Sequence, residues 1–588
     1  MTTALEPVVE SIVAVDIGST LTKAVLIDVV EGEYRILANA EYPSTLEPPW
    51  SDVALAVQQC ISRLEQIAVR ELLDTRGVLV IPEHDNGQGV DAFVATASAA
   101  EPLRVAIAGL MRDYSVESAR KATSATYALT ETLLSLDGEP GKAKQWDLPE
   151  RIAALHKQSP AVIVLVGGSD KGANAPLLDI ASAVAMACAT WPEVNKPDVV
   201  FAGNGAARGQ IAELIGTLVP LAVVDNVRPA AETENLAPLE NELETFYLER
   251  RLQRMPGFGK IAGSLTLPVV ATARAFGAGV RALARHFELN VLGVDIGGAT
   301  TTLAVSEQDR FVRVQRSDLG VSHNIERVAH QAGMPNVLRW LPSVMSANEA
   351  WDRLANKVLR PFTLPETRKD LELEQAVARE AMRLTLADLM QRWQTVQPQK
   401  YPGYLPTVDL LIGAGGVLTY APFPGQTVLL MLDALQPVSV VNLALDSGGL
   451  LSQLSLIASV QPQAAAQLAG REGISALGTA ICPIGAVPPG EVVVSYQMVY
   501  QDGGKVSGDV LAGEIEILPL AAGQKAELEL KPARLVDLGQ GKGRTGITTA
   551  EGGSVGVIID ARGRPLVLPG DPEKRAALNQ QWLYNVGA

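Results

Sequence analysis

Two short segments of this sequence place an aspartate and a glycine turn between two apolar runs. VDIGSTLTKAVL (15–26) aligns without gaps with VDIGGATTTLAV (294–305), and each predicts a strand, a tight turn and a second strand. Glycine adopts positive φ at little cost and leaves no side chain between the backbone and a ligand, so successive N–H groups can converge on phosphate oxygens. The segments therefore predict two phosphate-binding β-hairpins. A P-loop or a Rossmann turn would instead lead into a helix.

The chemistry expected of these hairpins is the binding of a magnesium nucleotide. Asp16 and Asp295 are the candidate catalytic residues, and they would hold a hydrated Mg²⁺, which favours carboxylates and keeps most of its waters. Lys23 would place a cation near the β- and γ-phosphates. One such turn could equally be an ordinary strand end, but two matched copies favour the phosphate interpretation. The other candidate phosphate-binding residues are Gly18, Ser19, Thr20, Gly297, Gly298, Thr300 and Thr301.

A third glycine turn follows the apolar run at 408–412, which predicts a strand. In this turn, Gly413, Gly415 and Gly416 would let an adenosine lie flat against the backbone. Such glycines are common where strands meet helices. The turn gains weight from its position after two phosphate hairpins.

This order of two phosphate motifs and one adenosine motif resembles the actin/sugar-kinase/Hsp70 ATPase superfamily. Lys23, the seventh residue after Asp16, is similar to the actin form. More narrowly, the chain resembles the glutamate mutase accessory family MutL/GlmL, which is unrelated to the mismatch-repair protein of the same name. The second resemblance covers roughly residues 11–460 and is carried by VDIGSTLTKAVLID, ATASAAEPLRVAIAGLMRD, VLVGGSDKGAN, VVFAGN, VVDNVRP, VDIGGATTT, IGAGGVL and LDALQP.

The resemblance implies a fold, two cofactors and a function. The fold would be α/β, with a duplicated actin-like (ribonuclease H-like) ATPase core, and the cofactors would be ATP and Mg²⁺. The implied function is an ATP-hydrolysing accessory or reactivating chaperone for an adenosylcobalamin-dependent mutase. A small-molecule kinase of the same fold and a self-associating, actin-like filament protein remain alternatives, because a fold alone does not settle function.

The elements that must position these turns divide the chain into four regions. We expect the first actin-like lobe at 1–154, an inserted α/β module plus a helical connection at 155–290, the second lobe at 291–482 and a β-rich C-terminal domain at 483–588. Between about 155 and 230, strands alternate with helices, which predicts a small doubly wound parallel sheet.

Several individual elements are also predicted. Apolar residues at helical spacing predict a helix over 51–70. Short apolar runs predict strands near 77–81, 91–96 and 103–109. A long amphipathic helix is expected at about 366–396, between Pro365 and Pro398.

Composition narrows the class of protein. The 588 residues are 47% apolar and 19% charged, with a formal net charge of −16 and no long basic run, so nucleic-acid binding is disfavoured. Neither a signal peptide nor an uncharged apolar run of about 18 residues is found, so a cytoplasmic protein without a membrane span is expected. The three cysteines form no CxxC pair, and Cys60 and Cys188 are expected to be buried thiols.

Overall fold

The structure is a computed structural model that describes residues 9–137, 147–394, 401, 403–485 and 487–588. The chain divides into two compact units. The first contains residues up to 99 together with 260–314 and 318–588, and the second contains 100–259 and 315–317.

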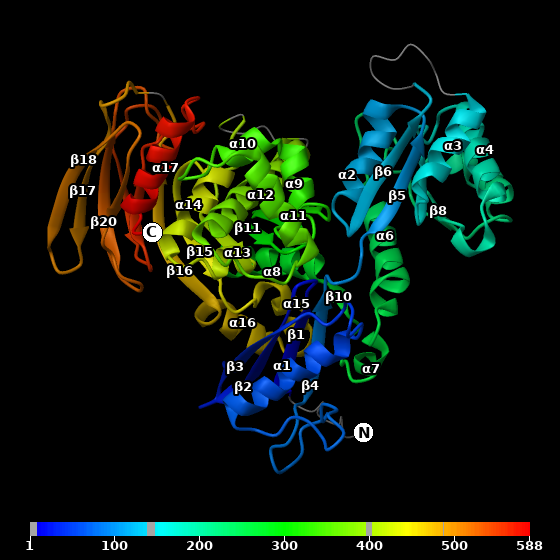
Figure 1. Ribbon diagram of the computed structural model, residues 1–588, viewed down its shortest axis with the longest axis horizontal. Coiled ribbons are helices and arrows are strands. Elements are labelled where there is room, and N and C mark those ends of the chain that lie inside the picture. The colour runs from blue at the N-terminus through cyan, green and yellow to red at the C-terminus, as the bar shows by residue number, and fades with distance from the viewer. Residues whose placement is uncertain (1–8, 138–146, 395–400, 402, 486) are drawn as a thin grey trace. The chain divides into compact units, whose positions relative to one another are not determined.

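The first lobe, in the first unit, is built on a five-stranded sheet that carries the first hairpin (Figure 1). Its strand order is β10-β4-β1-β2-β3. β1 is antiparallel to β2 and parallel to β4, so Asp16 lies beside both Lys23 and Thr96. The helix α1 (Val53–Ala68), capped by Asp52, packs on β2 and β3. The strands are β1 (Ile12–Ile17), β2 (Leu21–Val30), β3 (Glu33–Pro43), β4 (Ala92–Ala97) and β10 (Val270–Ala271).

The second lobe repeats this arrangement in the same unit. Its sheet begins β13-β12-β11-β14-β15, with β11 antiparallel to β12 and parallel to β14. The strand order therefore matches that of the first lobe, and the predicted duplicated actin-like, ribonuclease H-like core is confirmed. The strands are β11 (Val291–Ile296), β12 (Thr301–Glu307), β13 (Arg310–Arg316), β14 (Leu410–Ala414) and β15 (Ser439–Asp446).

Two helices join the lobes through a shared apolar core. They are α8 (Thr272–Phe287) and α15 (Leu451–Val460), and α16 (Pro462–Arg471) follows α15. A Cβ on Gly279 of α8 would come within 2.2 Å of the Leu451 carbonyl oxygen, so only glycine allows this approach. The core around the helices includes Ile12 from the first sheet and Ile412 from the second.

Further helices cover the second sheet, and one of them is the predicted long helix, α12 (Arg368–Gln394). Its expected limit at Pro398 falls outside the described residues. The others are α9 (Ile325–Ala332), α10 (Met334–Leu338), α11 (Ala347–Leu359), α13 (Gly416–Thr419) and α14 (Pro424–Leu435).

The second unit is a doubly wound module with a five-stranded, fully parallel sheet in the order β6-β5-β7-β8-β9. The expected boundary at 155 falls inside this unit, because β5 and β6 belong to the same sheet as β7. The strands are β5 (Leu103–Gly109), β6 (Ala128–Ser135), β7 (Val162–Val166), β8 (Asp198–Phe201) and β9 (Leu221–Val223). The helices are α2 (Glu117–Thr123), α3 (Leu148–Gln158), α4 (Ala175–Thr190), α5 (Arg208–Ile215) and α6 (Ala237–Arg250), while α7 (Phe258–Ala262) spans the boundary between the units.

The C-terminal region is rich in β-strands, as predicted, and is joined to the second lobe. One antiparallel sheet has the order β18-β17-β20-β21, whereas β16, β22 and β19 extend the second-lobe sheet to eight strands. The closing helix α17 (Pro572–Asn585) packs against α14 and β19 (Figure 1). The strands are β16 (Ile474–Cys482), β17 (Val492–Tyr500), β18 (Lys505–Leu511), β19 (Ile515–Leu518), β20 (Lys525–Pro532), β21 (Gly546–Glu551) and β22 (Gly556–Asp560).

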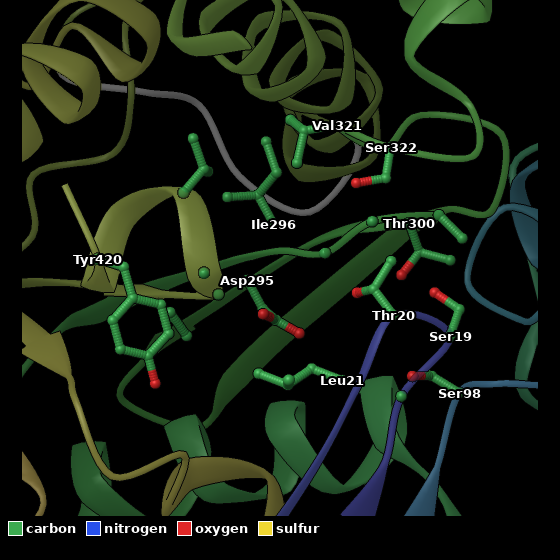
Figure 2. A pocket seen from close by; sticks show the side chains of 18 of the residues that line it. Ser19, Thr20, Leu21, Ser98, Asp295, Ile296, Thr300, Val321, Ser322 and Tyr420 are labelled. Carbon is green, nitrogen blue, oxygen red and sulfur yellow. The ribbon is translucent and has the colours of Figure 1, made fainter. Parts of the chain in front are cut away.

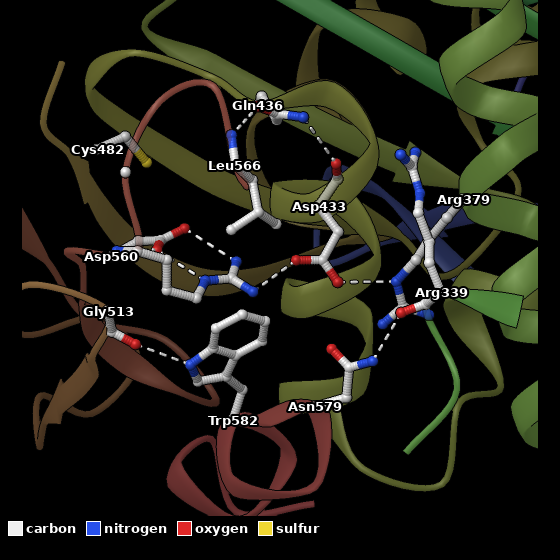
Figure 3. Close-up of polar contacts among 12 residues, drawn as sticks. Arg339, Arg379, Asp433, Gln436, Cys482, Gly513, Asp560, Leu566, Asn579 and Trp582 are labelled. Carbon is white, nitrogen blue, oxygen red and sulfur yellow. Dashed lines mark hydrogen bonds and ion pairs between the residues drawn. The ribbon is translucent and has the colours of Figure 1, made fainter. Parts of the chain in front are cut away.

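A buried network of Asp–Arg ion pairs connects this C-terminal region to the second lobe. Figure 3 shows Asp433 of α14 between Arg379 of α12 and the C-terminal segment. The carboxylate of Asp433 accepts from Arg379 Nε at 2.8 Å and from Arg562 Nη1 at 2.7 Å. Arg562 Nε and Arg564 Nη2 donate to Asp560 at 2.9 Å and 2.7 Å. Burial alone would raise the pKa of Asp560, but the two guanidinium groups hold it well below its usual range.

Other expectations have mixed outcomes. The predicted strand at 77–81 is wrong: Leu79 makes only an isolated bridge to Leu73, in a stretch that holds two turns. The three cysteines are free and buried, as expected for Cys60 and Cys188. Within the described ranges, no helix is long and apolar enough to cross a membrane.

Candidate functional site

The two predicted hairpin turns have the same local geometry. The Gly18 N–H donates to the Leu21 carbonyl at 3.1 Å, and the Gly297 N–H donates to the Thr300 carbonyl at 2.8 Å. In each turn, the glycine N–H therefore bonds to the carbonyl of the residue three positions later. Each turn directly follows the strand that carries the aspartate. The sequence repeat is thus also a structural repeat.

Both turns and the third glycine turn line one cavity of about 400 Å³ within the first unit. This volume suits a small-molecule ligand. Figure 2 shows the hydroxyl-bearing side chains of Ser19, Thr20 and Thr300 gathered on one side of Asp295 and the ring of Tyr420 on the other. The predicted residues that line the cavity are Asp16, Gly18, Ser19, Thr20, Lys23, Asp295, Gly297, Gly298, Thr300, Gly415 and Gly416.

Two predicted residues do not line the cavity. The hydroxyl of Thr301 is buried and donates to the Leu319 carbonyl at 2.7 Å, because its position in β12 turns it into the lobe. Gly413 lies within β14, where a Cβ would meet Leu418, Leu445 and Met431 at 3.0 to 3.2 Å. Thr301 therefore makes a hydrogen bond inside the second lobe, and Gly413 allows close packing there.

Close approach of neighbouring atoms explains two of the glycines that line the cavity, Gly298 and Gly415. A Cβ on Gly298 would lie 2.5 Å from Thr20 Cγ2, so the two hairpin turns meet at this glycine. Gly415 has φ +93°, and a Cβ there would lie 2.0 Å from the Ile296 carbonyl oxygen. The third turn therefore lies directly against the strand that carries Asp295.

Asp16 is held by two hydroxyl groups that the sequence analysis did not identify. Thr96 Oγ1 and Thr272 Oγ1 both donate to Asp16 Oδ1, at 2.8 Å and 2.7 Å. Burial raises the pKa of Asp16, while these bonds and the charge of Lys23 act to lower it. The two threonines come from β4 and α8, so they fix the carboxylate from two sides.

A third aspartate, the buried Asp446, also lines the cavity, and the sequence analysis missed it. It ends β15, and its carboxylate accepts from the N–H groups of Leu450 and Leu451 at 2.7 Å and 3.0 Å. One sequence signal could have found it, because LALDSGG (443–449) again places an aspartate and glycines after an apolar run. All three aspartates therefore lie within one residue of the end of a strand beside the cavity.

Burial raises the pKa values of the aspartates in this site. Burial raises the pKa of Asp295 to about 7, with a further contribution from the negative charge of Asp16. Burial likewise raises the pKa of Asp446 to about 6. A cation between these groups would relieve both the repulsion and the loss of hydration.

One wall of the cavity is apolar and could contact a nucleotide base. Phe362 and Leu364, from the loop before α12, line it together with Val417 of α13. Lys357 Nζ lies 3.0 Å from Glu374 Oε2 and also donates to the Thr363 carbonyl, so an ion pair steadies this loop. The flat turn at Gly415 lies beside this wall.

The residues present fit a hydrated Mg²⁺ and a nucleotide. Asp16, Asp295 and Asp446 offer hard carboxylate oxygens, and burial raises the pKa of each, so a nearby cation would favour their charged forms. Within the described ranges, no three His, Cys, Asp or Glu side chains lie close enough to enclose a metal ion directly. An ion held through its own waters does not require such a cluster.

The raised pKa of Asp295 predicts a pH-dependent stability. When a carboxyl group has a higher pKa in the folded chain than in the unfolded chain, it destabilises the folded chain at pH values above its pKa in the unfolded chain. For Asp295 this penalty grows from about pH 4 and is complete above about pH 7. We expect Asp295→Asn to unfold at a higher temperature than wild type when a chelator has removed metal ions. This gain in unfolding temperature should be about 2 °C larger at pH 8 than at pH 5.

Thermal unfolding followed by intrinsic fluorescence checks this expectation. Asp309→Asn, in the exposed turn between β12 and β13, is the matched control and should show no such pH-dependent difference. A gain for Asp295→Asn that is equal at both pH values would contradict the account.

Comparison with known proteins identifies the family. The MutL protein family matches residues 12–472. The chain belongs to the MutL family. The match contains both hairpins, the third glycine turn and Asp446, and it ends just before β16. Among curated proteins, no sequence matches this MutL-family chain.

Several solved structures are similar to this MutL-family chain at low identity. A nucleotide-free acetone carboxylase is 12% identical, with 86% of this chain and 81% of that chain covered and a TM-score of 0.33. The ethanolamine utilization protein EutJ from Carboxydothermus hydrogenoformans is 13% identical, with 79% and 90% covered and a TM-score of 0.26. The activator of 2-hydroxyisocaproyl-CoA dehydratase from Clostridium difficile, with bound ADPNP, is 9% identical, with 78% and 94% covered and a TM-score of 0.28. At such scores the fold assignment rests on the strand order described above.

Proposed function

We propose that this MutL-family chain binds and hydrolyses Mg-ATP and thereby serves as an accessory or reactivating protein for an adenosylcobalamin-dependent mutase. The observation that carries the ATPase part is the meeting of Asp16, Asp295 and three glycine turns in one cavity. The mutase as partner is supported by the family alone. A cytoplasmic location belongs to the same proposal.

In this proposal, different residues of the chain bind the phosphates and the metal ion. The N–H groups and hydroxyls of the two hairpins bind phosphate oxygens, and Lys23 supplies a positive charge beside them. Asp16 and Asp295 anchor the hydrated Mg²⁺, which when bound neutralises charge on the phosphates. Because the two hairpins belong to different lobes, a nucleotide that contacts both favours the closed arrangement, and loss of the γ-phosphate weakens it.

The test is recovery of an inactivated mutase. An adenosylcobalamin-dependent glutamate mutase whose cofactor has been damaged is incubated with the full chain, Mg-ATP and fresh adenosylcobalamin. We expect activity to return, and to return about tenfold less with Asp295→Asn. If the mutase stays inactive while ATP is hydrolysed, the partner is wrong. Phosphate transfer to a small molecule would indicate the kinase alternative, and ATP-dependent sedimentation would indicate the filament alternative.

A further inference from the structure

Glu41 of β3 contacts two residues that line the cavity, Lys23 and Tyr420. It pairs in register with Lys23 of β2, and Lys23 Nζ lies 3.6 Å from Glu41 Oε1. The hydroxyl of Tyr420 donates to the same Glu41 oxygen. Lys23 Nζ also lies 5.6 Å from the centroid of the Tyr420 ring. The three side chains therefore form one contact set.

This contact set joins the two lobes. Lys23 and Glu41 belong to the first sheet, whereas Tyr420 follows α13 and the third glycine turn in the second lobe. Burial raises the pKa of Tyr420, and the hydrogen bond and negative charge of Glu41 raise it further, so the hydroxyl keeps its proton and remains a donor. Tyr420, which belongs to the second lobe, thus holds the Glu41 carboxylate beside Lys23.

Lys23 is also the cation expected to meet the phosphates. It lines the cavity together with Asp16, Asp295 and Asp446, and a Cβ on Gly449 would touch its Cδ at 3.5 Å. Its side chain is only 17% exposed and that of Glu41 33% exposed, so their attraction is screened less than that of a pair in open water. A phosphate that takes Lys23 must therefore compete with Glu41.

We propose that Glu41 is a positioning residue that acts as a built-in competitor of phosphate for Lys23. This inference rests on the proposed function and deepens it. Nucleotide phosphates carry more negative charge than one carboxylate, so they can displace Glu41, whereas adenosine has no group that does so. Because Glu41 regains its ion pair with Lys23 once ADP has left, Glu41 stabilises the empty site and so favours release of ADP. The residue thus limits the affinity for phosphorylated nucleotides without touching the base.

The test compares Mg-ADP with adenosine by calorimetric titration of the full chain. Glu41→Gln removes the charge, but its amide oxygen can still accept from Tyr420. We expect Mg-ADP to bind about fivefold more tightly to Glu41→Gln than to wild type, the scale of a partly exposed ion pair, and adenosine to bind within about twofold of wild type. Glu33→Gln is the matched control, because Glu33 lies on the same strand, is 38% exposed and pairs with Arg35 instead. It should leave both affinities unchanged.

A second variant keeps the test decisive. Tyr420→Phe retains the ring and the Glu41 charge but removes the hydroxyl that holds the carboxylate, so Mg-ADP should bind about twofold more tightly. Unchanged or weaker Mg-ADP binding in Glu41→Gln overturns the inference, as does an equal gain for adenosine. If Glu41→Gln does not fold, Tyr420→Phe decides in the same way. If wild type binds no Mg-ADP at all, the proposed function fails as well.

Discussion

Asp16→Asn is expected to lower ATP turnover about 100-fold or more, and Asp295→Asn is expected to do the same. Asparagine has nearly the shape of aspartate but lacks the negative charge that would anchor a hydrated Mg²⁺. In Asp16→Asn, the amide oxygen can still accept from Thr96 and Thr272, so the strand end should keep its geometry. Steady-state phosphate release at saturating Mg-ATP measures the effect.

The exposed turn residue Asp309 provides the control for this prediction. Asp309→Asn removes the same charge at a second-lobe residue that does not line the cavity, and it should keep full turnover. Retention of more than half of the wild-type turnover in both Asp16→Asn and Asp295→Asn would contradict the assignment of the hairpins.

Arg562→Ala is expected to destabilise the second lobe by about 3–5 kcal/mol. The Arg562 side chain is fully buried, donates to both Asp433 and Asp560, and lies 4.8 Å from the centroid of the Trp582 ring. Its removal leaves each of two buried carboxylates with one ion-pair partner fewer. Among the side chains in the described ranges, Asp433 would then pair only with Arg379, and Asp560 only with Arg564. Urea unfolding followed by tryptophan fluorescence measures the loss.

Lys574→Ala is the matched control for Arg562→Ala. Lys574 is an exposed cation in the first turn of α17, so its replacement should change the unfolding free energy by no more than about 0.5 kcal/mol. Equal stability of the two variants would contradict a structural role for the buried network.

The same network implies that a chain truncated after Cys482 would lose β19 and β22 from the eight-stranded sheet and would not fold stably.

Local patterns in the sequence were sufficient to predict the two hairpins and the third glycine turn. Each hairpin combines an apolar strand, an aspartate and a glycine turn within about a dozen residues, and the match between residues 15–26 and 294–305 revealed the duplication. The conformational freedom of glycine also identified the turn at Gly415, which has φ +93°. These features depend on neighbouring residues, which is why one sequence can reveal them.

Features that depend on distant pairing could not be predicted in the same way. β10 is only two residues long, and the inserted module separates it from β4 in the sequence. It nevertheless pairs with β4 and completes the first sheet. The module begins near Ala100 because β5 pairs with β7, and no local pattern shows which sheet a strand will join. Thr272 reaches Asp16 from 256 residues away, so the support of that carboxylate is visible only in the folded chain.

The part of the cavity lining that contains Phe362 and Glu374 was missed for a related reason. Phe362 and Glu374 belong to segments that precede the third glycine turn, and they resemble ordinary loop and helix residues in the sequence. Only the packing of α11 and α12 in the second lobe brings them to the cavity. Charged residues of the C-terminal region, such as Asp560, likewise acquire their role only when β22 joins β16.

The most direct test of the central claim is a calorimetric titration of ATP into the full chain, with and without Mg²⁺. The account predicts one site per chain, at least tenfold tighter binding with Mg²⁺ than in a chelator, and loss of that difference in Asp295→Asn. Binding that is equally tight without Mg²⁺ and unchanged in Asp295→Asn, or no binding at all, would contradict it.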